Sequence, residues 1–376
     1  MNAGSRIMLV TSVLHEAPNG GRELLCKLNF DTLKSLYGDG LVLVELPRAR
    51  PRSVRQVMNA FRGHIDGLDK ASISAALALI ESGSVDKVFV DGSNLGEFVR
   101  VVKARFPRIE VITFFHNVEA RFFLGAFRQA KSIRSLAVLA ANCLAERKAV
   151  RFSDKRVSLS HRDSLKLQRL YGRAATHVVP MALQDQLRAH GGLRTLSDPK
   201  PERYALFVGG VFYANQAGIT WFVEHVVPRI DIKICIVGRG FEGLREALGH
   251  PGKVEVIGAV DSLADWYLNA EFVVAPIFDG SGMKTKVAEA LMFGRQVIGT
   301  PEAFSGYEKI IGLAGVVCSD ADEFVAAING FHVPVDTGVE RELRGIYDAE
   351  YSQDAFSRKM ALVLDGPLAR TTPING

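Results

Sequence analysis

A glycine-rich turn, two lysines and a glutamate follow one another closely in the stretch 271–300. The turn is Gly280-Ser281-Gly282, and Lys284, Lys286 and Glu289 come directly after it. The first amides of a helix are unpaired and its dipole is positive there, so lysines at this place need an anion. A carboxylate about two turns further on could hold hydroxyl groups of the molecule to which that anion belongs. The spacing therefore predicts a site for a phosphorylated, hydroxyl-bearing ligand.

The elements around this turn have the pattern of a strand, a turn, a helix and a second strand. Residues 272–277 form a short apolar run rich in β-branched side chains, and apolar residues recur at helical spacing from Met283 to Met292. Gly294 ends this helix before the apolar run 296–298. A simpler interpretation remains open: a tight turn, solvated lysines, and Glu289 paired with one of them across a helical turn.

Other candidate residues stand at the ends of predicted strands. Gly20-Gly21 lies between a strand over 6–11 and a helix, and either brings the backbone close to a ligand or forms a plain turn. His116 follows the strand 111–115, where it is either a hydrogen-bonded structural residue or a functional one. Further glycine turns occur at Gly209-Gly210 and at Gly238-Arg239-Gly240.

The alternation of strands and helices predicts an α/β fold with parallel sheets, whose ligands gather at the carboxyl ends of the strands. The 376 residues are too many for one ordinary core, so we expect two domains. The segment 182–203 is polar and has no strong period, and it reads as the connection between them. We predict an N-terminal domain over 1–184 and a C-terminal domain over 185–339, with a helix over 340–364 that packs back near the first domain.

Charge and cysteine content narrow the function classes. The net charge of +5 is concentrated in the N-terminal half, which contains the cations Arg48, Arg50, Arg52, Arg55, Arg62, Arg121, Arg128, Lys131, Arg134, Arg147, Lys148, Arg151, Lys155 and Arg156. Such a surface suits anionic lipid or a phosphorylated substrate, whereas no nucleic-acid recognition motif accompanies it. The four cysteines are far apart and indicate neither a disulfide framework nor a zinc site, and we predict no metal.

The helical stretch 120–152 mixes apolar and basic residues. It is either an ordinary amphipathic helix pair packed on the sheet or a basic face that lies against a membrane or a lipid-linked acceptor. The sequence shows neither a signal-peptide pattern nor an apolar run long enough to span a bilayer. We therefore expect a cytoplasmic protein that can lie peripherally at the inner face of a membrane.

The residues from Pro276 to Thr300 resemble the donor-binding segment of family 4 glycosyltransferases, which are retaining enzymes of the GT-B fold that use nucleotide sugars. The series Gly209-Gly210, Asn215, Gly218, Gly238 and Gly258 resembles the rest of the C-terminal domain of that family, and His116-Asn117-Val118-Glu119 its histidine loop. Two positions differ from the common pattern. Ser281 stands where the family usually has a glutamate, and residues 210–218 contain neither the arginine nor the lysine of the usual basic pair.

The resemblance implies two Rossmann-like domains that face a cleft, with the nucleotide sugar held mainly by the C-terminal domain. It implies that Glu289 binds the ribose hydroxyls, that Lys286 holds the diphosphate, and that His116 contacts the donor sugar. As catalytic residues we predict His116 and Lys286. The predicted donor-binding residues are Gly20, Gly21, Gly209, Gly210, Gly238, Arg239, Gly280, Ser281, Gly282, Met283, Lys284, Lys286 and Glu289.

The predicted reaction is transfer of a hexose from a UDP- or GDP-sugar to a hydroxyl of a glycan or a lipid-linked acceptor, without a cofactor. Synthesis of a bacterial-type surface polysaccharide or glycoconjugate is the expected setting. Two alternatives use the same fold. One is a sugar-nucleotide epimerase or a phosphorylase, and the other is a scaffold protein that binds the nucleotide sugar without turnover.

Overall fold

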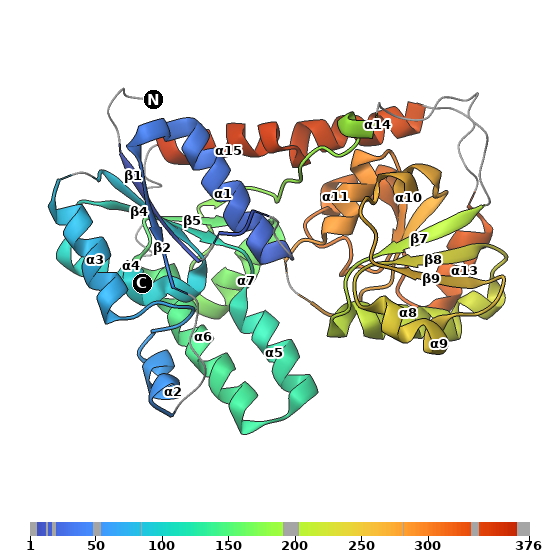
Figure 1. The fold of residues 1–376 in the computed structure, drawn as a ribbon, viewed down its shortest axis with the longest axis horizontal. Helices are drawn as coiled ribbons and strands as arrows, with labels where there is room; N and C mark the ends of the chain where they lie inside the picture. Colours follow the sequence, from blue (N-terminus) through green and yellow to red (C-terminus); the bar gives the residue numbers. More distant parts are fainter. Residues whose placement is uncertain are drawn as a thin grey trace, which may run out of the picture. The chain divides into compact units, whose positions relative to one another are not determined.

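The chain folds into two compact units, shown in Figure 1. Residues 1–181 and 356–376 belong to the first unit and residues 182–355 to the second. The computed structural model describes residues 6–12, 14–16, 20–47, 54–83, 85–190, 203–280, 282–331 and 338–366. Its division thus falls at 181 and 355, where the sequence predicted boundaries at 184 and 339.

The first unit is a parallel sheet with helices on both of its faces. Along the chain its elements are β1 (Ile7–Thr11), α1 (Gly21–Tyr37), β2 (Leu41–Glu45), α2 (Val54–Phe61), α3 (Lys70–Glu81), β3 (Lys87–Asp91), α4 (Gly96–Arg105), β4 (Glu110–Phe115), α5 (Glu119–Ala130), α6 (Ile133–Phe152), β5 (Lys155–Ser158), α7 (His161–Tyr171), β6 (His177–Val178) and most of α15 (Gln353–Asp365). Figure 1 shows α1 above the strands and α6 below them.

The strand order in this sheet is β2-β1-β3-β4-β5-β6, and all pairs are parallel. Strand β1 lies between β2 and β3, so the chain turns first to one side of β1 and then to the other. In sheets of this kind ligands bind at the carboxyl ends of the strands beside such a switch point. Thr11 and Asp91 end the two strands that meet there.

The second unit is a second parallel sheet. Its elements are β7 (Tyr204–Val208), α8 (Tyr213–His225), β8 (Lys233–Val237), α9 (Arg245–Leu248), β9 (Val254–Gly258), α10 (Ala264–Asn269), β10 (Phe272–Ala275), α11 (Thr285–Met292), β11 (Val297–Gly299), α12 (Ile311–Ala314), β12 (Gly315–Val317), α13 (Ala321–Asn329) and α14 (Gly338–Ile346). Figure 1 shows α8 on one face of this sheet and α10 and α11 on the other.

The strand order here is β12-β11-β10-β7-β8-β9, again with parallel pairs throughout. This is the doubly wound order of nucleotide-binding folds, and its switch point lies between β7 and β10. Four strands are buried along their whole length and, except for Thr11, apolar, as expected for a sheet covered on both faces: β1, β7, β10 and β11. The glycine-rich turn 280–282 follows one of the two central strands, β10.

The structure differs from the sequence analysis in three places. The short strand β12 was not predicted, because three residues carry too little pattern. The helix predicted over 340–364 is divided into α14, a π-helical turn (Tyr347–Tyr351) and α15. In the polar segment 182–203, Leu183 and Leu187 are buried within the second unit, whereas residues 191–202 lie outside the described part of the chain.

Two cations of the predicted basic surface are buried. Lys155 is fully buried, and its ammonium group donates to the carbonyl oxygens of Val363 (2.8 Å) and Gly366 (2.7 Å) and pairs with Glu110 (2.8 Å). It thereby fixes the end of α15 to the sheet of the first unit. Arg156 is also buried and donates to the carbonyl oxygens of Ala174 and Ser153. Arg48, Arg50 and Arg52 lie outside the described residues.

Candidate functional site

Three glycine turns meet at the carboxyl ends of β7, β8 and β9. The amide of Gly209 donates to the carbonyl of Val237 (3.0 Å), and the amide of Gly238 donates to the carbonyl of Gly258 (2.7 Å). Gly209 (φ 156°) and Gly238 (φ 153°) have backbone conformations that side chains rarely allow, and a Cβ at Gly238 would overlap the carbonyl oxygen of Gly209. The glycines are therefore needed for the close approach of these turns.

Lys286 reaches the Gly209 turn from the first turn of α11. Its side chain is buried, and its ammonium group donates to Oδ1 of Asn215 (3.1 Å) and lies 4.3 Å from the centre of the Phe207 ring. A Cβ at Gly209 would lie 3.3 Å from this nitrogen. The predicted diphosphate-binding lysine is thus brought to the predicted glycine turn, although 77 positions of sequence separate residues 209 and 286.

The surroundings of Lys286 act on its protonation. Burial lowers the pKa of Lys286 to about 7, Glu289 acts to raise it and Lys284 acts to lower it further. A diphosphate beside the ammonium would offset the burial and restore the charged form. A buried lysine with a neutral hydrogen-bond partner costs folding free energy, which is typical of a group kept for function.

Unlike Lys286, Lys284 pairs with a carboxylate. Neither lysine is solvated, so the simpler interpretation of the sequence is wrong on this point. Lys284 is the N-cap residue of α11, and its ammonium group pairs with Glu302 (3.0 Å) and donates to the carbonyl of Gly282 (3.1 Å). The hydroxyl of Tyr307 donates to the carbonyl of Lys284 (2.9 Å). Lys284 therefore holds the glycine-rich turn to the start of the helix.

Glu289 is half-buried on the same helix. Its Oε2 accepts a hydrogen bond from the hydroxyl of Tyr267 (2.6 Å), whose ring stacks on Phe293 with 5.1 Å between ring centres. Burial raises the pKa of Glu289, while the hydrogen bond from Tyr267 and the charge of Lys286 act against it. The sequence left open that Glu289 pairs with a lysine across a helical turn. In the structure its carboxylate instead accepts a hydrogen bond from Tyr267.

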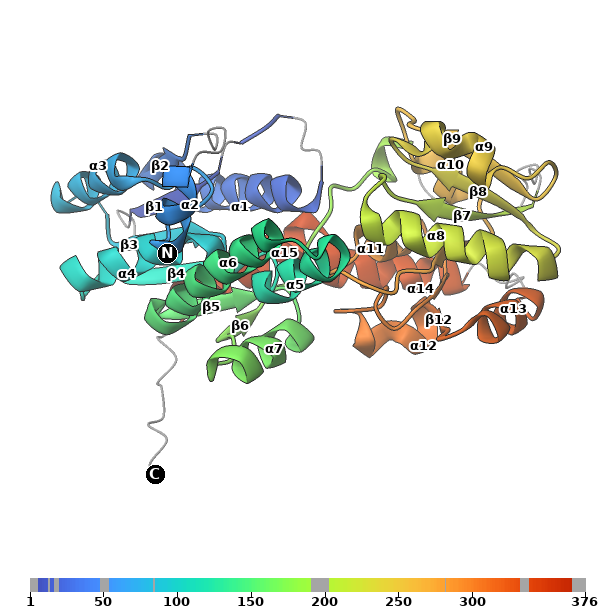
Figure 2. The same cartoon turned by 90° about the horizontal axis from the view of Figure 1, so that it is seen from below.

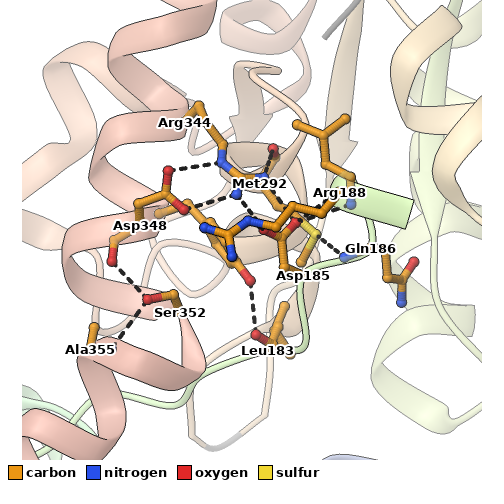
Figure 3. Close-up of polar contacts among 11 residues, drawn as sticks. Leu183, Asp185, Gln186, Arg188, Met292, Arg344, Asp348, Ser352 and Ala355 are labelled. Carbon is orange, nitrogen blue, oxygen red and sulfur yellow. Dashed lines mark hydrogen bonds and ion pairs between the residues drawn. The ribbon is translucent and has the colours of Figure 1, made fainter. Parts of the chain in front are cut away.

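The far end of α11 is braced by α14, as Figure 3 shows. Arg344 forms ion pairs with Asp185 and with Asp348 (2.9 Å) and donates to the carbonyl of Met292 (3.3 Å), the last residue of α11. The hydroxyl of Tyr347 donates to the carbonyl of Leu183 (2.8 Å). These contacts all lie within the second unit, and they fix the axis of the helix that carries Lys286 and Glu289.

The remaining predicted donor-binding residues of this unit lie near these turns. Gly280 (φ 143°) and Gly282 (φ 68°) adopt conformations that favour glycine, whereas Ser281 between them is outside the described residues. Met283 is buried under Gly306. The side chain of Arg239 is exposed, and the carbonyl of Arg239 accepts the amide of Val211 (2.9 Å), next to Gly210.

In the first unit, His116 belongs to a buried polar cluster at the switch point. Its Nε2 lies 2.5 Å from Oδ1 of Asp91, which also accepts the side-chain amide of Asn29 (2.8 Å), and Oδ2 of Asp91 accepts the Thr11 hydroxyl (2.7 Å). Burial acts to raise the pKa of Asp91, but the interaction with His116 outweighs it and lowers it to about 2. The carboxylate is ionised and can only accept, so Nε2 of His116 carries the proton.

Cys26 adjoins this cluster. Cys26, Asp91 and His116 present sulfur, oxygen and nitrogen atoms within 4.8 Å of one another, a grouping that the sequence analysis did not predict. Each group already has a hydrogen-bond partner: the thiol contacts the hydroxyl of Ser12 (3.6 Å), and His116 contacts Asp91. Burial and the nearby Asp91 raise the pKa of Cys26 to about 12. We therefore describe the cluster as a hydrogen-bond network that orients the imidazole.

The histidine loop and the first glycine loop are both followed by helices. Gly20 (φ 120°) is the N-cap of α1, and Gly21 is its first residue. At the start of α5, the buried carboxylate of Glu146 accepts the amides of Glu119 (2.8 Å) and Ala120 (3.1 Å). This caps α5 and fixes the chain just after His116.

The chain is similar to a known protein family over part of its length and to solved structures over nearly all of it. Residues 202–332 match the family model described as "Glycosyl transferases group 1". No curated protein sequence matches the chain. Among solved structures, it resembles a sucrose-phosphate synthase from Thermosynechococcus elongatus (TM-score 0.66, 16% identity, 96% of this chain and 98% of that chain covered).

Two more solved structures resemble the chain over the same share of its length. Anabaena HepE in complex with UDP has a TM-score of 0.65 and 14% identity, with 96% of this chain and 100% of that chain covered. WaaG, "a glycosyltransferase involved in lipopolysaccharide biosynthesis", has a TM-score of 0.62 and 15% identity at 96% and 100% coverage. The chain has the GT-B fold, as the sequence predicted. Over residues 202–332 it is similar to the group 1 glycosyl transferases.

Proposed function

We propose that the protein transfers a hexose, with retention of anomeric configuration, from a nucleotide diphosphate sugar to an acceptor hydroxyl. The bond between the anomeric carbon and the diphosphate oxygen breaks, a bond to the acceptor oxygen forms, and the acceptor proton is released. The observation that carries this proposal is the buried ammonium group of Lys286 beside the Gly209 turn at the switch point of the second sheet.

The charge change in the reaction explains why a lysine suits this place. Negative charge grows on the leaving diphosphate as the bond breaks, so a fixed cation stabilises the transition state more than the ground state. The first amides of α11 and its dipole act in the same direction. Glu289, held by Tyr267, would accept hydrogen bonds from the ribose hydroxyls, and His116 would contact the donor sugar from the first unit.

A UDP-sugar is the donor that we propose first, because HepE, which has a similar fold, has been solved with UDP and with UDP-glucose. A GDP-sugar is the second candidate. The acceptor that we propose is a glycan or a lipid-linked glycan of a surface polysaccharide. A galactosyltransferase of the lipopolysaccharide outer core is among the proteins of similar fold.

The test is a product analysis. The purified protein is incubated with a panel of UDP- and GDP-sugars and an acceptor extract, and the products are identified by mass spectrometry. We expect a glycosylated acceptor and free nucleoside diphosphate in equal amounts, and an NMR spectrum that shows the donor's anomeric configuration in the product. Free nucleotide with a 2-epimer would identify an epimerase, and binding without turnover would identify a scaffold protein.

A membrane surface is the partner that we propose for the first unit, through the tip of the α5–α6 helix pair. These helices lie side by side in both views (Figures 1 and 2). Ile133 is 89% exposed and Leu136 is 49% exposed. Three exposed cations, Arg128, Lys131 and Arg134, are close to them in sequence, and Arg121 is exposed at the start of α5. Apolar side chains among cations are typical of a surface that binds anionic lipid. No helix in the described part of the chain is long and apolar enough to cross a bilayer.

Liposome sedimentation tests this surface. We expect more binding to anionic than to neutral vesicles, with loss of binding at high salt. Each cation near an anionic surface contributes about 1 kcal/mol, so the double variant Arg128→Ser, Arg134→Ser should weaken binding roughly 30-fold. The exposed pair Lys309 and Arg341 of the second unit provides a control with the same charge change. Equal binding to both kinds of vesicle would show that the tip is solvated surface only.

A further inference from the structure

Asn215 lies between the Gly209-Gly210 turn and Lys286. It is a buried residue in the first turn of α8. Its Nδ2 donates to the carbonyl of Gly210 (2.8 Å), while its Oδ1 accepts the ammonium group of Lys286 (3.1 Å). A Cβ at Gly209 would lie only 2.5 Å from Nδ2 of Asn215. The side-chain amide of Asn215 therefore joins the glycine turn to Lys286. The amide fits there because residue 209 has no Cβ.

The groups that face the Lys286 ammonium from the packed elements are neutral. Strand β7 presents the ring of Phe207, and α8 presents the amide of Asn215. Among the described residues, the charged groups that act on it are both on its own segment: Glu289, whose carboxylate accepts the Tyr267 hydroxyl, and Lys284, which is paired with Glu302. The hydrogen-bond partner of Lys286 is thus an amide and carries no charge.

We propose that Asn215 is a positioning residue that aims the Lys286 ammonium at the donor diphosphate without neutralising it. A carboxylate in this place would hold the lysine as firmly but would cancel the charge that the diphosphate needs. The amide holds it by a hydrogen bond and, through Gly210, fixes the turn and the cation to each other. This inference rests on the proposed function, since it requires that a nucleotide diphosphate sugar binds beside Lys286.

The contact between Asn215 and Lys286 predicts how donor binding depends on pH. Burial lowers the pKa of Lys286 to about 7 in the free protein, and a bound diphosphate favours the protonated form. Above this pH the protein must take up a proton to bind the donor, so affinity falls about tenfold per pH unit. A carboxylate at position 215 raises the pKa of Lys286, which removes the proton uptake, and it also competes with the diphosphate.

The experiment is calorimetry with UDP-glucose and GDP-glucose at pH 6.5, 7.5 and 8.5, because the charge of a diphosphate diester is constant over this range. For wild type we expect the affinity to fall about tenfold from pH 7.5 to 8.5. For Asn215→Asp we expect affinity at pH 6.5 at least about tenfold weaker, and a fall of less than about threefold between pH 7.5 and 8.5. The slope of this variant shows that position 215 faces the Lys286 ammonium group, and the affinity of Asn215→Ala shows whether the amide positions it.

Gln216→Asp is the matched control, since it introduces the same charge at the next, exposed position of α8. We expect it to follow the wild-type pH profile. Asn215→Ala tests the geometry without adding charge, and we expect the wild-type slope with about five- to tenfold weaker binding. Circular dichroism verifies that each variant is folded, and Asn215→Ala alone decides the geometric part if Asn215→Asp does not fold.

The two proposals fail in different ways. If no member of the panel of UDP- and GDP-sugars binds wild-type protein at any pH, the proposed function is refuted and the inference with it. If wild type binds, but Asn215→Asp keeps both its affinity and its pH slope, the role of Asn215 alone is refuted. Unchanged binding by Asn215→Ala would likewise show that Lys286 needs no positioning by the amide.

Discussion

Replacement of Lys286 by methionine should lower the rate of transfer without lowering the stability of the fold at neutral pH. The methionine side chain has a similar length and packs well beside the Phe207 ring, but it has no charge to bury. Since Lys286 is buried, its charged form destabilises the native state at neutral pH. The variant should therefore lose transfer activity, by about 10²–10³ in rate as for one preorganised contact, without the stability loss of an ordinary core substitution.

The expected magnitude follows from proton linkage. The pKa of Lys286 is lowered from 10.5 in the unfolded chain to about 7 in the native state. Between these values the unfolded chain binds one proton more than the native state, so wild-type stability rises with pH. The slope is about 1.4 kcal/mol per pH unit. The methionine variant has no such slope, so its stability relative to wild type should fall by about 2 kcal/mol from pH 8.0 to 9.5.

Urea unfolding at pH 6.0, 8.0 and 9.5 measures this difference. Both tryptophans of the chain, Trp221 and Trp266, belong to the second unit, so their fluorescence reports on the unit that contains Lys286. Lys309→Met removes an exposed lysine from the same unit and should leave the pH dependence unchanged. Parallel stability curves for wild type and Lys286→Met over this range would refute the reasoning, because Lys286 would then keep its proton in the native state.

Four further substitutions test contacts of the site and of the two cores. Glu289→Ala should weaken binding of a nucleoside diphosphate by roughly 2–3 kcal/mol in calorimetry and Tyr267→Phe by about 1 kcal/mol, and unchanged affinity in folded protein would contradict the ribose contact. Lys155→Met should destabilise the first unit by about 3 kcal/mol in urea unfolding followed by circular dichroism, because it leaves a carboxylate and two carbonyl oxygens without their buried cation. Arg344→Met should lower the stability of the second unit by about 2 kcal/mol in tryptophan fluorescence, whereas Arg341→Met, at an exposed position, should have little effect.

Local pattern was enough to predict most of the fold. The central strands are mostly apolar runs of four to six residues, so β1, β4 and β10 were predicted from the sequence to within about two residues at either end. The C-terminal helix was not predicted correctly, because its interruption depends on contacts that are distant in sequence. The amide of Leu183 donates to the carbonyl of Tyr351 (3.0 Å), and the hydroxyl of Tyr347 donates to the carbonyl of Leu183. Such tertiary bonds compensate the backbone of a π-helical turn that no local pattern specifies.

The candidate site was predictable where its residues are neighbours in sequence, and not where the fold brings distant residues together. Lys284, Lys286 and Glu289 share one helix, so their spacing indicated a site, but the partners of Lys286 come from β7 and α8. Two contacting residues were not assigned to the site from the sequence: Asp91, which contacts His116, and Asn215, which contacts Lys286. Their positions in the sequence could nevertheless have indicated them.

Asp91 and Asn215 are polar residues at the end of an apolar strand and in the first turn of the helix after a glycine turn. In a parallel sheet these are the positions from which side chains reach the carboxyl edge. In the first unit, a search of the sequence for polar residues directly after apolar strands would have identified Asp91. An ionised Asp91 fixes the proton on Nε2 of His116, so only Nδ1 of the imidazole is left for the contact with a sugar hydroxyl that we propose.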